Sequence, residues 1–366
     1  MKRVMVVMGT RPEAVKLCPV ILELKRRNRL ETVVCSTGQH RSMLDSTMEA
    51  FSVKADVDLD VMRVGQSVSA VTGRILTVTD GLLAKERPDF ILVQGDTATA
   101  FGAALCAFHR RIPIGHVEAG LRTYHMHAPF PEEFHREAIS MISDFHFAPT
   151  QVAKNNLLRE GKPEKRVFLT GNTVVDALRI SLGKKVESEW DFPKQSRILI
   201  FTAHRREHFG APLNGMFRAL RRIVELHPDV IAVCPLHPSP EVRRAAKENL
   251  EGCARIRMIE PPETVSFHRL LAKSYLVLTD SGGIQEETTA LGIPTVVMRY
   301  STERTEGIRA GCLKLVGSGE SGIVRTACRL LEPTSEEYAA MKKPSSVFGD
   351  GMASVRIANV LERILK

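Results

Sequence analysis

The sequence predicts an α/β protein with two doubly wound, Rossmann-like parallel-sheet domains and a ligand cleft between the domains. Short apolar runs alternate with longer amphipathic segments along almost the whole chain, which is typical of parallel sheets covered by helices on both faces. This pattern occurs twice, and a polar stretch at residues 182–196 separates the two halves. A chain of 366 residues is also long enough for two hydrophobic cores.

Each half contains apolar runs with the length and composition of strands. In the first half the expected strands are residues 3–8, 31–36, 90–93, 112–117, 145–148 and 167–169. In the second half they are residues 197–201, 230–234, 256–259, 275–278, 295–298 and 313–316. We expect an N-terminal domain over residues 1–172 and a C-terminal domain over residues 173–350. A final helix at residues 351–366 is expected to pack back across the domain junction.

The composition excludes several classes of protein. Hydrophobic residues make up 43% of the chain and charged residues 25%, which is typical of a folded globular protein. No apolar run approaches the ~20 residues that span a bilayer, and the apolar stretch at residues 4–8 is too short for a signal peptide. We therefore expect a cytoplasmic protein that does not contact membranes.

The seven cysteines contain no CxxC pair, so neither a cysteine metal site nor a disulfide framework is expected. The net charge is +9, but only 5% of the residues are aromatic and the Lys and Arg residues are scattered along the chain. This distribution favours a solvated surface over a nucleic-acid partner. The functional alternative is attraction of a small polyanion such as a diphosphate.

Three carboxylates in the first half are expected at the carboxyl end of one parallel sheet. Asp96 follows the strand at residues 90–93, Glu118 follows the strand at residues 112–117, and Glu132 comes early in the helix after a proline loop. A helix cap explains Asp96 alone, the helix dipole explains Glu132, and a cap fits Glu118 less well. Together the three acids predict one cleft, in which crowding and desolvation would leave an acid and a base near neutral pH.

Cations follow the first strand of each half. Arg11 and Lys16 come after the strand at residues 3–8, near a helix N-terminus that favours anions, although an ordinary turn with two surface cations also fits. His204 follows the strand at residues 197–201 together with two arginines, where either a diphosphate or an Arg/Glu surface network is possible. Arg136 is four residues after Glu132 and is its expected helical partner. Neither GxGxxG nor GxxxxGK[ST] occurs, so no nicotinamide cofactor is expected.

Ser281 and Gly282 open a helix after the strand at residues 275–278. A glycine lets a ligand approach the backbone, and the free N–H groups of a new helix suit phosphate. Glu287 could accept hydrogen bonds from ribose hydroxyls. Ser281 is not expected to be a hydrolase nucleophile, because the GxSxG motif is absent.

In these segments the chain resembles the non-hydrolysing bacterial UDP-N-acetylglucosamine 2-epimerases. The resemblance covers nearly the whole chain in ordered blocks: GTRPEAVKLCPV, TGQHRSML, QGDTATA, HVEAGLRT, PFPEE, FAPT, TGNTVVDA, TAHRRE, TDSGGIQEE, LGIPTVVMR, TER and GDG. It implies the glycosyltransferase-B architecture and interconversion of UDP-GlcNAc with UDP-ManNAc. UDP would be eliminated to give 2-acetamidoglucal and then added back, with no metal or cofactor, in a homodimeric enzyme.

The resemblance also implies roles for individual residues. The catalytic residues would be Asp96, Glu118, Glu132 and His204. The substrate-binding residues would be Arg11, Lys16, Arg136, Phe267, Ser281, Gly282 and Glu287, with Phe267 at the position where a phenylalanine lines the uracil.

The chain departs from the family pattern at several positions, including Tyr124-His125, His135, His208 and Thr305. Many bacterial members bind a second UDP-GlcNAc as an activator. Around that pocket Gln39, Glu132 and His237 match the family, whereas Ser42 replaces a glutamine and Gly65 an arginine. We therefore expect activation by UDP-GlcNAc to be weakened or absent, or the substrate to differ somewhat.

Three other functions compete with this interpretation. A retaining glycosyltransferase of the same fold would use the same nucleotide site, but it does not need three acids in the N-terminal half. A hydrolysing 2-epimerase would release UDP and free ManNAc. A catalytically inactive UDP-sugar sensor would not need all three carboxylates.

Overall fold

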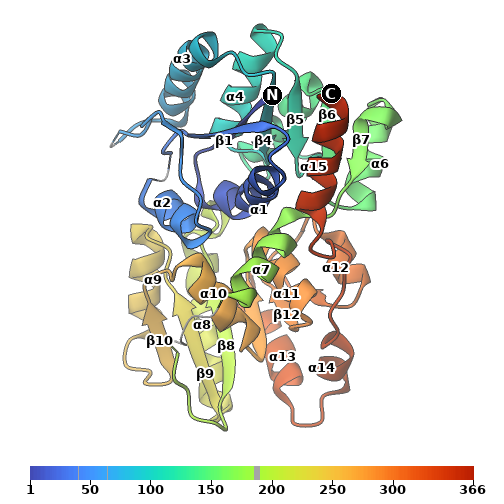
Figure 1. Ribbon diagram of the computed structural model, residues 1–366. Helices are drawn as coiled ribbons and strands as arrows, with labels where there is room; N and C mark the ends of the chain where they lie inside the picture. Colours follow the sequence, from blue (N-terminus) through green and yellow to red (C-terminus); the bar gives the residue numbers. More distant parts are fainter. Residues whose placement is uncertain (40, 64, 185–189) are drawn as a thin grey trace. The chain divides into compact units, whose positions relative to one another are not determined.

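The computed structural model describes residues 1–39, 41–63, 65–184 and 190–366, and the chain divides into two compact units (Figure 1). Unit 1 comprises Met1–Ile180 and Gly349–Lys366, and unit 2 comprises Ser181–Phe348. The division therefore falls within helix α7 (Thr173–Gly183), whereas the expected boundary, after residue 172, lies just before this helix. Part of the expected linker, residues 185–189, lies outside the described residues.

The sheet of unit 1 is parallel throughout, with the strand order β3-β2-β1-β4-β5-β6-β7. Its strands are β1 (Arg3–Met8), β2 (Glu31–Ser36), β3 (Val57–Asp58), β4 (Phe90–Gln94), β5 (Ile114–Val117), β6 (Phe145–Ala148) and β7 (Val167–Leu169). Six of them were predicted. The two-residue strand β3 at the sheet edge was missed, because it is too short to show a period.

Several helices of unit 1 start at residues that cap them. They are α1 (Arg11–Arg27), α2 (Arg41–Ala50), α3 (Val68–Glu86), α4 (Ala98–His109), α5 (Glu132–Ile142), α6 (Gln151–Arg159), α7 and α15 (Ala353–Ile364), with a 3-10 turn η1 at Glu164–Arg166. The hydroxyls of Ser67, Thr97 and Thr150 each accept a backbone N–H in the first turn of the helix they precede.

The C-terminal helix α15 belongs to unit 1, where it packs against α1; the two helices lie side by side in Figure 1. Asp176 of α7 fixes the start of α15, because its carboxylate accepts the backbone N–H groups of Ala353 and Ser354 at 3.1 and 2.8 Å. Ile357 and Leu361 on the inner face of α15 are fully buried. This helix therefore completes the hydrophobic core of unit 1.

The sheet of unit 2 is also parallel, with the order β10-β9-β8-β11-β12-β13. Its strands are β8 (Arg197–Thr202), β9 (Val230–Pro235), β10 (Ile256–Ile259), β11 (Leu276–Thr279), β12 (Thr295–Val297) and β13 (Leu313–Leu315). Its helical segments are η2 (Arg206–His208), α8 (Ala211–Leu226), α9 (Pro240–Leu250), α10 (Thr264–Ala272), α11 (Gly282–Leu291), α12 (Thr305–Arg309), α13 (Glu320–Leu331) and α14 (Glu336–Met341). All six strands were predicted, and the two doubly wound sheets confirm the predicted fold class.

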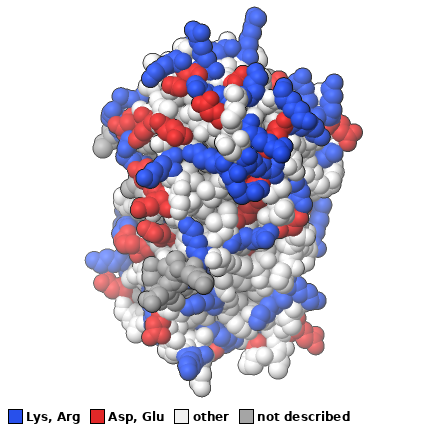
Figure 2. All heavy atoms as spheres, viewed as in Figure 1, with Lys and Arg blue, Asp and Glu red and all other residues white. Residues whose placement is uncertain are grey.

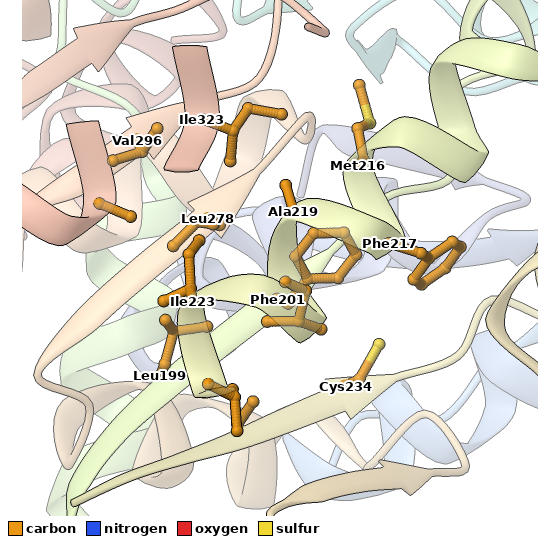
Figure 3. Close-up of a cluster of buried hydrophobic side chains, with 14 of the residues drawn as sticks. Leu199, Phe201, Met216, Phe217, Ala219, Ile223, Cys234, Leu278, Val296 and Ile323 are labelled. Carbon is orange, nitrogen blue, oxygen red and sulfur yellow. The ribbon is translucent and has the colours of Figure 1, made fainter. Parts of the chain in front are cut away.

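The core of unit 2 forms where α8 and α13 cover one face of this sheet (Figure 3). The helical spacing of apolar residues in α8 places Met216, Ala219 and Ile223 on its buried face. Together with Leu199 and Phe201 of β8 they belong to one cluster of buried side chains, drawn in Figure 3. The core thus holds β8 rigidly beneath the loop that follows it.

The strand order reverses once in each sheet, between β1 and β4 in unit 1 and between β8 and β11 in unit 2. In open α/β sheets ligands bind outside the carboxyl ends of the strands at such a point. The predicted segments around Arg11, Asp96, His204 and Ser281 follow these four strands directly. A cleft between the two units stays a prediction.

The surface is charged but mixed. Figure 2 shows Lys and Arg side chains interspersed with Asp and Glu on the face that it presents. Within the described residues, no helix is long and apolar enough to cross a bilayer, and no group of His, Cys, Asp or Glu side chains could hold a metal ion. The seven cysteines are free thiols.

Candidate active site

Asp96 lies in the turn after β4 and is held by helix α5. The Arg136 guanidinium binds Oδ2 of Asp96 through two of its nitrogens, with Nε at 3.0 Å. The neighbouring His135 donates from Nδ1 to the carbonyl oxygen of Asp96 at 2.9 Å and stacks on Phe101 with the ring centroids 5.1 Å apart. Both the side chain and the backbone of this predicted catalytic acid are therefore fixed by α5.

Glu118 follows β5 in an unusual backbone conformation. Its φ is +63°, in the left-handed region, which costs a non-glycine residue on the order of 1 kcal/mol. Its buried carboxylate forms an ion pair with Lys16 and accepts hydrogen bonds from Gln94 Nε2 at 3.0 Å and Asn172 Nδ2 at 3.2 Å. Lys16, which the resemblance placed among the substrate-binding residues, is thus paired in the structure with a predicted catalytic acid.

Glu132 is the first residue of α5 and is half-buried, and its predicted pairing with Arg136 stays a prediction. The next residue, Glu133, has a structural role that the sequence did not reveal. It is fully buried and accepts the backbone N–H groups of Thr123 and Tyr124, both at 2.8 Å, and a bond from Arg136 at 3.1 Å. Glu133 thereby anchors the Tyr124–His125 loop, which departs from the family pattern.

The turn after β1 carries Arg11, which opens α1 and is half-buried. Glu13, two residues later, is fully buried and receives four hydrogen bonds from the turns around it. Burial raises the pKa of Glu13 to about 7, although the hydrogen bonds from Thr97, Gly9 and Thr10 act in the opposite direction. Glu13 lies in the GTRPEAVKLCPV block, but the sequence suggested no role for it.

The corresponding point in unit 2 is organised around Asp280, which follows β11 and is fully buried. Oδ2 of Asp280 accepts the backbone N–H groups of His204 and Arg205, both at 3.0 Å, and Nδ1 of His208 at 3.2 Å. Nδ1 of His204 lies 3.3 Å from Oδ1 of Asp280. The His204 ring also stacks on His237, with centroids 5.4 Å apart. His204, which the sequence predicted as a site residue, is thus oriented by Asp280, which the sequence did not predict.

Ser281 is the N-cap of α11, and Gly282 is its first residue. A Cβ atom at position 282 would lie 2.8 Å from Cζ of Arg304, so only glycine fits there. Arg304 is itself held in a buried ionic cluster, with Nε bonded to Glu286 at 2.9 Å. Arg304 therefore packs directly against the start of α11, where Ser281, Gly282 and Gly283 remain half-buried.

Glu287 lies farther along α11 and is only 7% exposed. Its Oε1 lies 3.4 Å from Nε2 of His268, and its Oε2 has no hydrogen-bond partner among the described residues. A buried carboxylate oxygen without a partner is costly unless a ligand supplies a donor. Ribose hydroxyls would supply one.

Phe267 lies on α10 and packs into an apolar cluster with Ile198, Ile200 and Leu271. It is 9% exposed, so core packing is the contact that the structure describes for it. Its role at a uracil stays a prediction.

The four residues of the expected activator pocket come from both units. In unit 1, Gln39 accepts a bond from Thr99 Oγ1 at 3.0 Å, and Gly65 has a φ of +76°. The side chain of Ser42, on α2, lies outside what the structure describes. In unit 2, His237 is exposed and stacks on His204. The expectation of weakened activation stays a prediction.

Known proteins resemble this chain in sequence and in fold over nearly their whole length. A family model for UDP-N-acetylglucosamine 2-epimerase matches residues 22–362. The UDP-N-acetylglucosamine 2-epimerase of Bacillus subtilis is 45% identical over 98% of this chain and 94% of its own, and that of Neisseria meningitidis is 43% identical over 98% and 99%.

Solved structures agree with these relatives. The crystal structure of the Neisseria meningitidis UDP-GlcNAc 2-epimerase bound to UDP-GlcNAc superimposes with a TM-score of 0.96 at 42% identity, covering 99% of this chain and 100% of that one. The Methanocaldococcus jannaschii enzyme in complex with UDP-GlcNAc and UDP gives a TM-score of 0.84 at 30% identity, with the same coverage. The chain belongs to the UDP-N-acetylglucosamine 2-epimerase family.

Proposed function

We propose that this enzyme interconverts UDP-GlcNAc and UDP-ManNAc by eliminating UDP to form 2-acetamidoglucal and adding UDP back. The observation that carries the proposal is the pairing of two acids with cations at neighbouring strand ends. Asp96 is held by Arg136 after β4, and Glu118 is held by Lys16 after β5. Such pairing keeps both acids at fixed positions from which they can exchange protons with a sugar carbon.

The chemistry requires both a proton carrier and a stabilised leaving group. No carbonyl group acidifies the C2 proton of the sugar, so breaking the C1–oxygen bond to UDP must accompany its removal. One carboxylate takes the C2 proton as the C1–C2 double bond forms, and the pair of electrons in the C1–oxygen bond leaves with UDP. A proton delivered to the opposite face of C2 and the return of UDP to C1 complete the inversion without net gain or loss of atoms.

Unit 2 has features suited to holding UDP in place between its elimination and its return to C1. The N-terminus of α11 at Ser281 and Gly282 is suited to the diphosphate, and His204 follows the adjacent strand β8. Oε2 of Glu287 is available for a ribose hydroxyl. The structures of relatives that contain UDP-GlcNAc or UDP support a UDP-sugar as the substrate.

Incubation with UDP-GlcNAc in deuterated water, followed by NMR, tests the proposal. We expect deuterium at C2 and an equilibrium with intact UDP-ManNAc. Accumulation of UDP with free ManNAc would contradict the proposal and indicate a hydrolysing epimerase. Consumption of an added acceptor without exchange at C2 would indicate a glycosyltransferase.

Substitution of the three acids tests their roles. Asp96→Asn, Glu118→Gln and Glu132→Gln should each lower kcat by about 10²- to 10⁴-fold, because each removes a proton carrier or its charge. Binding of UDP, measured by calorimetry, should remain within a few-fold of wild type. Glu86→Gln at the end of α3 is the matched control, since Glu86 pairs with Arg3 at the amino end of β1, away from the carboxyl ends of the strands. Wild-type kcat in all three acid variants would contradict the mechanism.

A further inference from the structure

Glu13 makes more hydrogen bonds than its place in the helix requires. As the third residue of α1 it completes a capping box, in which the backbone N–H of Thr10 donates to Oε2 of Glu13 at 2.8 Å. Oε2 also accepts the hydroxyl of Thr10 at 2.8 Å and the backbone N–H of Gly9 at 3.0 Å. Oε1 accepts the hydroxyl of Thr97 at 2.7 Å. Capping alone accounts only for the bond from the backbone of Thr10.

The additional bonds connect two turns at the point where the strand order of unit 1 reverses. Gly9 and Thr10 follow β1, and Thr97 follows the neighbouring strand β4. Thr10 adjoins Arg11, and Thr97 adjoins Asp96. The carboxylate of Glu13 is therefore the bridge between a turn that carries a predicted phosphate ligand and a turn that carries a predicted catalytic acid.

The burial of Glu13 argues that this bridge is more than a cap. A capping box works equally well with a glutamate or a glutamine, and its side chain can remain in water. Glu13 has no exposed surface, and a buried carboxylate is costly unless donors replace its water. Here four donors from three residues surround it, which fixes its position and theirs.

We propose that Glu13 is a positioning residue, which holds the Arg11 turn and the Asp96 turn in register through Thr10 and Thr97 without touching the substrate. This inference rests on the proposed epimerase function, because the two turns matter only if Arg11 and Asp96 act on one substrate. It predicts that Glu13 and Thr97 affect turnover as a coupled pair.

A double-mutant cycle tests the coupling. Glu13→Gln, Thr97→Val and the double variant are assayed for kcat, KM and UDP affinity at pH 8, where the carboxylate is charged. Each single change should lower kcat on the order of 10- to 100-fold, because a small displacement of a catalytic group has an effect of this size. UDP affinity should change by less than about threefold. The double variant should be no slower than the slower single variant, since both changes break the same link.

Two controls separate positioning from folding. Thr97→Ser keeps the hydroxyl and should restore kcat to within about twofold of wild type. Ser67→Ala removes an ordinary N-cap, at α3, and should lower the melting temperature while leaving kcat unchanged.

Wild-type kcat in Glu13→Gln and Thr97→Val, or losses that multiply in the double variant, would overturn the inference and leave the proposed function intact. A wild-type enzyme that exchanges no deuterium at C2 would overturn the proposed function, and with it the inference.

Discussion

A carboxylate that is fully removed from water stays charged only where hydrogen-bond donors and positive charge replace the water. Burial raises the pKa of Asp280. Four interactions lower it by more than burial raises it: the charge of His204, the hydrogen bond from His208 and the backbone N–H groups of Arg205 and His204. The net pKa of Asp280 therefore lies well below its usual range. Because this carboxylate faces Nδ1 of His204, it favours the tautomer that leaves Nε2 of that ring available to a ligand.

We expect Asp280→Asn to lower both activity and stability. The amide would place N–H groups against donors, so kcat should fall at least about 10-fold and the free energy of unfolding by about 2–4 kcal/mol. Kinetics and urea denaturation measure the two effects. Asp89→Asn is the control, because the Asp89 side chain is 35% exposed, and there the loss should stay below about 1 kcal/mol. Wild-type behaviour of Asp280→Asn would refute the orienting role.

Single residues show where prediction from the sequence stops. Asp96, Glu118 and His204 could be proposed because each follows an apolar run, and strand ends are where ligands bind. Spacing alone could not show that Glu133, rather than Glu132, fixes the Tyr124 loop, since adjacent helical positions differ by a large rotation about the axis. The bond from Thr97 to Glu13 and the bonds to Asp280 come from segments distant in the sequence, which spacing does not connect.

At the scale of elements, two neighbouring strands of unit 1, β5 and β6, carry buried histidines. His116 of β5 and His146 of β6 are paired positions on these adjacent parallel strands. Burial lowers the pKa of His116 to about 4 and that of His146 to about 3, and the neighbouring His116 adds to the effect on His146. Both imidazoles are therefore neutral in the folded protein at neutral pH.

This burial predicts a loss of stability in acid. In the unfolded chain a histidine binds its proton near its ordinary pKa of 6.5, whereas the folded protein resists protonation down to about pH 4 at His116 and about pH 3 at His146. Stability is thus fully present above pH 6.5 and is lost as the pH falls through this window, by about 3 kcal/mol for His116 and about 5 kcal/mol for His146.

His146→Gln removes one of the two groups and should flatten the decline in unfolding free energy between pH 7 and pH 4.5. Urea denaturation at a series of pH values measures this decline. His109→Gln, on the exposed end of α4, is the control and should follow the wild-type profile. Equal slopes for wild type and His146→Gln would rule out the buried histidine as a source of the decline.

The elements themselves were largely readable from the sequence. The apolar runs gave twelve of the strands, with ends that differ by at most two residues, because burial on both faces makes such strands continuously apolar. The predicted strand at residues 112–117 begins only at Ile114, since the turn after α4 occupies the two residues before Pro113. Edge strand β3 pairs through only two residues, and nothing in its composition distinguishes it from a loop.

At the scale of the whole molecule, unit 1 depends on the last helix of the chain. Leu361→Ala should lower its stability by about 2–5 kcal/mol, because this side chain is fully buried on α15. Hydrogen exchange read by mass spectrometry should show faster exchange in α1, against which α15 packs, and unchanged exchange in β8 and β9 of unit 2. Lys366→Ala, at an exposed position, is the control. Unchanged exchange in α1 would show that α15 contributes little.

The same arrangement has a consequence for synthesis on the ribosome. The chain leaves unit 1 after Ile180 and re-enters it only at Gly349. Unit 2 is therefore contiguous in the sequence, whereas the N-terminal portion of unit 1 is translated well before α15, which packs against α1. Translation of the unit that carries the candidate acids starts before that of unit 2 and continues after it, so we expect the acids to reach their final geometry only after residues 349–366 have emerged from the ribosome.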